Sequence, residues 1–189
     1  MKKLIKITAI MLIAVIAISM VGCKAVDENG AKLIVKSLIE SSYELNEIYY
    51  GKGLMPQATD SEDNNSLYIP VAGNENYQSR DELVNRTYEI FSDDLAESMI
   101  DMAFNGAQGA IGSTLVMARY IEYYGKLNVR RNIDGIEIAK YDFSTIEIEK
   151  NSRRFIRAKI KIKNSEKSEY AEITLINEDD GWRLDNNTF

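Results

Sequence analysis

The pattern of apolar and polar residues divides the chain into a helical first half and a strand-rich last third. Residues 31–50 are predicted to form a helix, because their apolar side chains fall on one face of a 3.6-residue repeat and their glutamates on the other. Gly51 and Gly53 end this helix, and a polar loop follows it. The apolar face consists of Ile34, Leu38, Leu45 and Ile48.

Two shorter helices are predicted next, each from a capping signal. Residues 79–82 read Ser-Arg-Asp-Glu, in which the Ser hydroxyl and the Glu carboxylate are spaced to accept free backbone N–H groups reciprocally. Ser92 is followed by two aspartates and is the expected cap of the second helix. The residues predicted to face inward are Leu83, Thr87, Ile90 and Phe91 in the first helix and Leu95, Met99 and Ala103 in the second.

The middle of the chain carries weaker signals. Leu67 to Val71 is predicted to be a short strand. Residues 113–124 fit either a helix or a strand. We favour a strand that enters a hairpin, because Gly125-Lys126 directly after Tyr123 and Tyr124 is typical of a turn.

The last third is predicted to be an antiparallel meander with one face in water. Apolar and charged residues alternate in successive runs, with turn residues around 151–152, 164–167 and 179–181. Lys and Arg on the middle run face Glu on its neighbours, which favours one register. Helices followed by a meander predict one α+β domain over residues 31–189, with the helices packed on one face of a curled sheet. The apolar sets are Ile146 and Ile148; Ile156, Ala158, Ile160 and Ile162; and Ala171, Ile173 and Leu175.

The N-terminus has the features of an export signal. Three lysines precede an apolar run over residues 7–18, and Cys23 follows Val21 and Gly22. This order resembles the lipobox of bacterial lipoproteins. The resemblance implies a signal peptide over residues 1–22, a diacylglycerol-modified Cys23, a tether over 23–30 and an extracytoplasmic domain anchored to the cell membrane by lipid. Two alternatives stay open: a secretory signal that leaves Cys23 free, and an uncleaved anchor, for which the apolar run is short.

Composition limits the chemistry available to the domain. The chain has no His and a single Cys, and it has no phosphate-binding glycine loop and no Ser-x-x-Lys pair. We therefore predict that it is not an enzyme and holds no metal or cofactor. The acidic segment 60–65 lacks the turn glycine and the bidentate glutamate of a calcium loop, so we interpret it as a solvated loop. Paired carboxylates for glycoside hydrolysis stay open because Asp and Glu are abundant, although nothing in the sequence places two of them in one pocket.

The charge balance argues against nucleic acid as a partner, because 29 acidic residues outnumber 23 basic ones. Removal of residues 1–22 takes away three lysines and no acid, which leaves 20 basic residues against 29 acidic ones. A domain with this excess of negative charge is expected to stand off an anionic membrane.

Tyrosine is the residue type that points to a protein partner. The chain has eleven Tyr residues, and several are paired or lie beside loops, among them Tyr77 and the pair Tyr123-Tyr124. Tyr combines apolar area with a hydroxyl and is enriched at protein interfaces, although each of these residues also fits a helix–sheet core. The predicted partner-binding residues lie around the acidic loop and are Tyr49, Tyr50, Asp60, Glu62, Asp63 and Tyr68.

Four segments in order resemble a known family. They are 47–54 (Glu-Ile-Tyr-Tyr-Gly-Lys-Gly-Leu), 79–92 (beginning Ser-Arg-Asp-Glu-Leu and ending Ile-Phe-Ser), 120–127 (ending Gly-Lys-Leu) and 181–184 (Gly-Trp-Arg-Leu). This order is similar to the exported cystatin-like and nuclear-transport-factor-like proteins of low-GC Gram-positive bacteria. Among these it most resembles the DL-endopeptidase inhibitor family, and the likeness covers residues 45–184.

The resemblance implies a cystatin-like fold and a domain that plugs the cleft of a cell-wall cysteine endopeptidase, which limits the cutting of peptidoglycan. In that role the Tyr side chains would supply most of the binding energy, and the three acids would accelerate association with a basic cleft rim. Two other functions stay open: a cone-shaped domain that binds a small molecule, and a non-catalytic accessory lipoprotein of an envelope complex. A closed apolar pocket would favour the small-molecule ligand.

Overall fold

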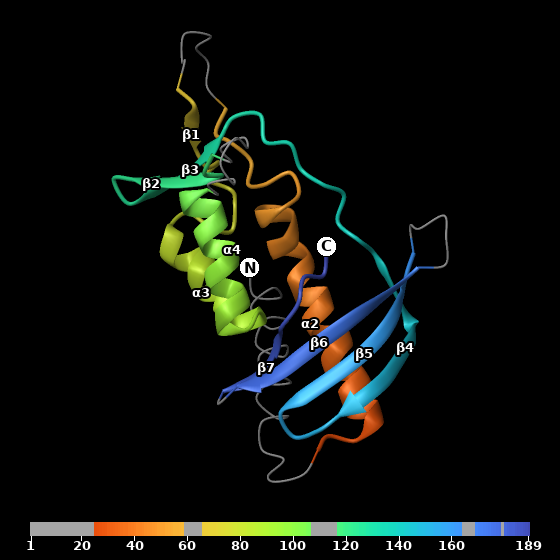
Figure 1. The fold of residues 1–189 in the computed structure, drawn as a ribbon. Helices are drawn as coiled ribbons and strands as arrows, with labels where there is room; N and C mark the ends of the chain where they lie inside the picture. Colours follow the sequence, from red (N-terminus) through yellow and green to blue (C-terminus); the bar gives the residue numbers. More distant parts are fainter. Residues whose placement is uncertain (1–24, 59–65, 107–116, 164–168, 179) are drawn as a thin grey trace, which may run out of the picture.

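The computed structural model describes residues 25–58, 66–106, 117–163, 169–178 and 180–189, and these form three helices and two antiparallel sheets (Figure 1). The α+β class predicted from the sequence is confirmed. The helices are α2 (Glu28–Tyr49), α3 (Arg80–Ile90) and α4 (Asp93–Asn105). The small sheet contains β1 (Tyr68–Pro70), β2 (Tyr120–Tyr123) and β3 (Lys126–Arg130). The large sheet contains β4 (Tyr141–Asn151), β5 (Phe155–Ile162), β6 (Tyr170–Glu178) and β7 (Gly181–Leu184).

The large sheet is the predicted meander, with its strands in the order β4-β5-β6-β7. Lys159 on β5 pairs in register with Glu147 on β4 and with Glu172 on β6, so the expected alternation of charge across the outer face is confirmed. Arg157 adds a further contact on this face, since its Nε lies 3.4 Å from a Glu172 carboxylate oxygen. Such exposed pairs each contribute only a few tenths of a kcal/mol, and their main effect is to favour this register.

The core lies between the inner face of the large sheet and α2, which runs across that face (Figure 1). Helix spacing brings Val35 and Ile39 of α2 to the sheet, and both are fully buried. The strands contribute every second residue, as a period of two requires. These fully buried strand residues are Ile156, Ala158 and Ile160 of β5 and Ile173 and Leu175 of β6.

The two short helices begin where the sequence predicts, but only one uses the expected cap. Ser79 and Glu82 form the full capping box of α3. Ser92 occupies the cap position of α4, yet its hydroxyl makes no capping hydrogen bond. Instead, Ser92 Oγ donates to a carboxylate oxygen of Asp185 at 2.8 Å, and the Ser92 backbone N–H donates to the carbonyl of Leu184. The side-chain cap expected for Ser92 is therefore wrong, because the hydroxyl is directed towards Asp185 in the C-terminal segment and accepts no hydrogen bond from the first turn of α4.

The small sheet is the main departure from the predicted architecture. The strand expected at residues 67–71 exists as β1, but it pairs with β3, as in the register of Ile69 with Val129, and does not join the meander. The hairpin predicted after residue 119 is confirmed as β2 and β3. Residues 107–116, which include the start of the ambiguous segment, lie outside the described residues. The helices therefore pack with two sheets, and the small one sits at the C-terminal end of α2 (Figure 1).

Candidate protein-binding site

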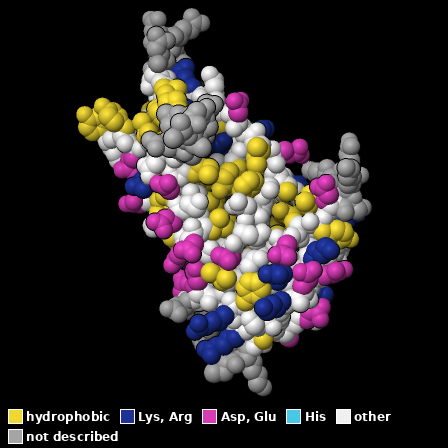
Figure 2. All heavy atoms as spheres, in the orientation of Figure 1, with side chains coloured by type: hydrophobic (Ala, Val, Ile, Leu, Met, Phe, Trp, Pro, Cys, Tyr) yellow, Lys and Arg dark blue, Asp and Glu magenta, His cyan; other side chains and the backbone are white. Residues whose placement is uncertain are grey.

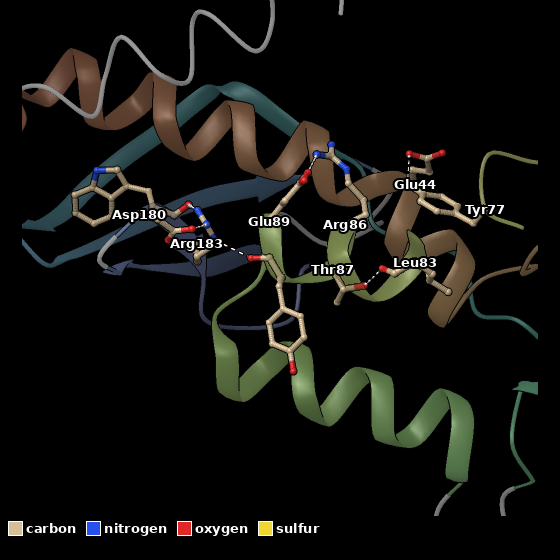
Figure 3. Close-up of polar contacts among 10 residues, drawn as sticks. Glu44, Tyr77, Leu83, Arg86, Thr87, Glu89, Asp180 and Arg183 are labelled. Atoms are coloured by element: carbon tan, nitrogen blue, oxygen red, sulfur yellow. Dashed lines mark hydrogen bonds and ion pairs between the residues drawn. The ribbon is translucent and has the colours of Figure 1, made fainter. Parts of the chain in front are cut away.

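Tyr49, one of the predicted partner-binding residues, belongs to the core. Its side chain is 5% exposed, and its hydroxyl lies 2.7 Å from the Thr87 hydroxyl of α3. Thr87 in turn donates to the carbonyl of Leu83, one turn earlier in α3 (Figure 3). Burial raises the pKa of Tyr49 well above its usual value, because the phenolate would lose its hydration. In this conformation Tyr49 joins α2 to α3 and offers almost no surface to a partner.

Tyr50 and Tyr68 are half-buried and engaged within the chain. The Tyr50 ring stacks on Phe189, with ring centroids 3.9 Å apart, and burial raises the pKa of Tyr50 to about 12. The Tyr68 hydroxyl donates to the carbonyl of Ala118 at 2.9 Å. Asp60, Glu62 and Asp63 lie outside the described residues, as does Cys23. A role for these residues in binding or lipidation stays a prediction.

The C-terminal segment that covers Tyr50 is held by a buried polar cluster. Thr188 Oγ1 lies 3.0 Å from Ser42 Oγ and accepts a hydrogen bond from the Asn46 side-chain amide at 2.9 Å. All three residues are fully buried and cannot bind water. Their hydrogen bonds to one another satisfy polar groups that burial has removed from water. The last residues of the chain are thus fixed against α2.

An arginine from the start of β2 caps the C-terminus of α2. The Arg119 guanidinium donates to the carbonyl of Ile48 at 3.1 Å and to that of Gly51 at 3.0 Å. A cation here stabilises the partial negative charge of the helix end, and α2 has no basic residue of its own in its last turn. Tyr120 adds a second link, because its hydroxyl donates to Ile48 and accepts from the N–H of Leu54. These contacts fix the base of the β2–β3 hairpin to α2.

The tip of that hairpin carries the most exposed aromatic side chains of the described chain. Tyr123 is 61% exposed and Tyr124 is 89% exposed, and their rings meet edge to face with centroids 4.4 Å apart. In Figure 2 hydrophobic side chains project from the surface where the hairpin lies. We call residues 123–125 the hairpin tip. Two adjacent tyrosines in water give a rigid apolar surface with two hydroxyls, which is the kind of anchor that protein interfaces use.

Local backbone preference does not explain Tyr at this position. Tyr124 and Gly125 both have positive φ angles, of 50° and 69°, as a two-residue hairpin turn of this type requires. Asn or Gly is preferred at the first of these positions, and a bulky side chain there is costly by roughly 1 kcal/mol. Strain of this kind persists where another property of the residue is useful. The sequence contains this signal as Tyr-Tyr-Gly within a predicted hairpin. The partner-binding residues were instead predicted around the acidic loop, so Tyr123 and Tyr124 were missed.

An acidic groove lies beside the hairpin, between α3 and α4. Its volume is about 690 Å³. The backbone N–H of Arg80, at the mouth of this groove, donates to a Glu122 carboxylate oxygen at 3.1 Å, which joins the hairpin to α3. Figure 2 shows acidic side chains in a band below the projecting hydrophobic tip. The acidic residues of the groove are Asp81, Asp94, Glu97 and Asp101.

A second hollow continues from this groove at Tyr88 towards β7, where Arg183 holds α3 in place. The Arg183 guanidinium donates to the carbonyl of Tyr88 and pairs with Asp180 at 2.6 Å (Figure 3). Arg183 thus caps the C-terminus of α3, as Arg119 caps that of α2. Both hollows are open and lined largely by charged residues, and neither is an enclosed apolar cavity. This geometry gives no support to the small-molecule alternative.

Two further properties bear on the kind of site. Within the described ranges, no three His, Cys, Asp or Glu side chains gather as a metal site would require. In the same part of the chain, no helix combines the length and apolar character needed to cross a bilayer.

The fold and these surfaces define an α+β domain with an aromatic hairpin tip and an acidic flank. No protein-family model matches the chain, and no curated protein matches it in sequence. The likeness to endopeptidase inhibitors therefore rests on the four sequence segments given above.

Proposed function

We propose that the protein is a lipid-anchored extracytoplasmic domain that binds another protein through the hairpin tip. The observation that carries the proposal is the exposed pair Tyr123 and Tyr124, held in a turn that local preference would give to smaller residues. The base of the hairpin is fixed by Arg119 and Tyr120, so a partner meets an ordered surface. An ordered anchor loses little conformational entropy on binding, which favours affinity.

The position of the hairpin tip suits a partner in the cell wall. The tether enters at the N-terminus of α2, and the small sheet lies at the other end of this 22-residue helix (Figure 1). A helix of that length spans about 33 Å. With the lipid at Cys23, the hairpin tip would therefore point away from the membrane, towards peptidoglycan and the enzymes that cut it.

The partner that we propose is a cell-wall cysteine DL-endopeptidase, whose cleft the hairpin tip would enter. The acidic flank on α3 and α4 would meet a basic rim and accelerate association, as proposed from the sequence for Asp60, Glu62 and Asp63. Residues 51–54, part of the segments that resemble the inhibitor family, pack beside the base of the same hairpin, where the Leu54 N–H donates to Tyr120.

A wall-digestion assay tests this function. Purified cell walls are incubated with a cysteine DL-endopeptidase and increasing amounts of the protein, and the release of wall fragments is followed. We expect digestion to slow in proportion to complex formation, measured in parallel by a binding assay. Undiminished digestion at excess protein, with no detectable complex, would contradict the endopeptidase as partner. Binding without inhibition would favour the accessory role in an envelope complex.

The anchor is tested separately through Cys23. Cys23→Ser is expected to abolish incorporation of a labelled fatty acid and to leave the precursor uncleaved, because the thiol is the atom that carries the diacylglycerol. Labelling of the wild-type chain in the same cells is the control. Label that survives the substitution would contradict the lipoprotein assignment and would leave the binding function of the hairpin tip untouched.

A further inference from the structure

The basic residues of this acidic protein are concentrated on one β-hairpin of the large sheet. Between Lys150 and Lys163 the chain has seven basic residues and no acidic one, although acids outnumber bases overall. The turn between β4 and β5 presents Arg153 and Arg154, both exposed. Lys150 lies over the Phe155 ring at 5.2 Å, and Arg157 lies over the same ring at 5.5 Å. We call Lys150, Arg153, Arg154 and Arg157 the basic turn.

Arg157 of the basic turn pairs with Glu172, and four acids on the elements that border the turn are engaged within the chain. Asp27 caps α2 by accepting from Gly30, and Glu28 pairs with Lys32 at 2.8 Å. The end of β6 is bonded to the turn, because the side-chain amide of Asn177 donates to the carbonyl of Arg153. There Glu178 accepts a hydrogen bond from the N–H of Asp93. Asp180, just after β6, pairs with Arg183. Among the described residues neither Arg153 nor Arg154 has an ion-pair partner. Their charges therefore face solvent without compensation.

The basic turn lies beside the point where the tether enters the domain. The side-chain amide of Asn151, the last residue of β4, donates to the carbonyl of Val26 at 2.5 Å. Figure 1 shows the start of α2 and the β4–β5 turn at the same end of the molecule, and Figure 2 shows basic side chains gathered there. Val26 is the third residue after Cys23, and three extended residues span at most about 11 Å. An acyl chain on Cys23 would therefore hold the end of the domain that carries the basic turn close to the bilayer surface.

We infer that the basic turn binds anionic phospholipid headgroups and sets the orientation of the domain on the membrane. The inference rests on the proposed anchor at Cys23, which brings the turn to the surface. The net negative charge of the domain predicts repulsion from an anionic membrane. At the end that carries the basic turn, the local positive charge would produce attraction instead. Each basic side chain near an anionic surface strengthens association about fivefold. The same orientation directs the hairpin tip away from the bilayer.

The experiment measures the distance of the turn from the bilayer in the acylated mature protein. Cys23 is the only Cys in the chain, so a fluorophore attaches selectively to a Ser152→Cys variant once Cys23 is acylated. Energy transfer to a headgroup-labelled lipid is compared in vesicles of phosphatidylglycerol with phosphatidylcholine and in vesicles of phosphatidylcholine alone. We expect clearly higher transfer in the anionic vesicles and loss of this difference in high salt.

A matched pair of variants separates the basic turn from general charge. Arg153→Gln with Arg154→Gln should lower transfer in anionic vesicles to the value seen in neutral ones. Lys161→Gln with Lys163→Gln removes the same charge from the other end of β5, roughly 25 Å away, and should leave transfer unchanged. Circular dichroism shows whether each variant keeps the fold; should the double arginine variant unfold, Arg154→Gln alone is expected to halve the effect.

Three outcomes would overturn the inference. The first is equal energy transfer in the anionic and the neutral vesicles. The second is an equal loss of energy transfer in the arginine and the lysine double variants. The third is displacement of the protein from anionic vesicles by free poly(glycerol phosphate), at a phosphate concentration below that of the lipid. The last result would assign the turn to a wall polymer. Failure of the anchor shows itself differently, because the protein would not float with neutral vesicles.

Discussion

Replacing Tyr124 by Asn is expected to weaken binding of the partner protein at least tenfold while leaving the fold equally stable or more stable. The side chain is 89% exposed and stacks only on Tyr123, so its loss opens no cavity. Asn adopts the left-handed conformation that the turn requires, which relieves roughly 1 kcal/mol of strain. Loss of a central aromatic anchor typically lowers affinity by 2 kcal/mol or more, which is about thirtyfold.

The opposite signs of these two effects make the test specific for a binding role. Affinity is measured by titration of the endopeptidase, and stability by urea denaturation of the same preparations. Tyr170→Asn is the matched control, since Tyr170 is also exposed, at 48%, but lies on the large sheet away from the hairpin. A Tyr124→Asn variant that binds as tightly as the wild type would show that the hairpin tip does not contact the partner.

Raising the pH through the range from about 10 to 12 is expected to lower the free energy of unfolding by several kcal/mol. Burial raises the pKa of Tyr77, Tyr120 and Tyr141 to about 12 from an ordinary value of 10.0, because each phenolate would lose hydration in the folded state. Below pH 10 these hydroxyls are neutral in both the folded and the unfolded chain, and their contribution to the free energy of unfolding is fully present. Above it the unfolded chain loses protons that the folded chain retains, so stability falls as the pH rises.

Each fully buried tyrosine contributes on the order of 1 kcal/mol per pH unit to this slope. Tyr141→Phe is expected to make the slope shallower, because Tyr141 is 3% exposed and its ring remains packed. The measurement is a series of urea titrations at increasing pH. Equal slopes in the wild type and Tyr141→Phe would contradict a burial origin for the effect.

Local patterns in the sequence were sufficient for the large sheet and for the start of the two short helices. The start of α2 was predicted wrongly, because the helix begins at Glu28 with Asp27 as its N-cap, within the segment expected to be a tether. A period of two over residues 155–162 and 170–178 placed Ile156 and Ile173 in the core, because alternation alone decides which face a strand residue takes. The capping box at Ser79 was equally readable, since both of its hydrogen bonds lie within four residues. The hairpin after Tyr120 followed from its turn residues.

The candidate site was less predictable, because the fate of each tyrosine depends on residues far away in the chain. Tyr49 and Tyr123 both stand in Tyr-Tyr pairs followed by Gly. Tyr49 is buried because α3 brings Thr87 to its hydroxyl, while Tyr123 stays exposed because nothing in the described chain packs on the hairpin tip. The same sequence pattern therefore yields a core residue in one place and a surface anchor in the other.

By itself the sequence determined the α+β class, the meander with its register of charges, and the capping box of α3, all of which depend on contacts between near neighbours or on a simple repeat. Only the tertiary structure decided that β1 pairs with β3 in a separate sheet, and that Arg119 and Arg183 cap helices to which they do not belong. It also brought the basic turn beside the start of α2, through the bond from Asn151 to Val26. Each of these contacts joins segments separated by at least 58 residues, and no local propensity or period encodes such a pairing.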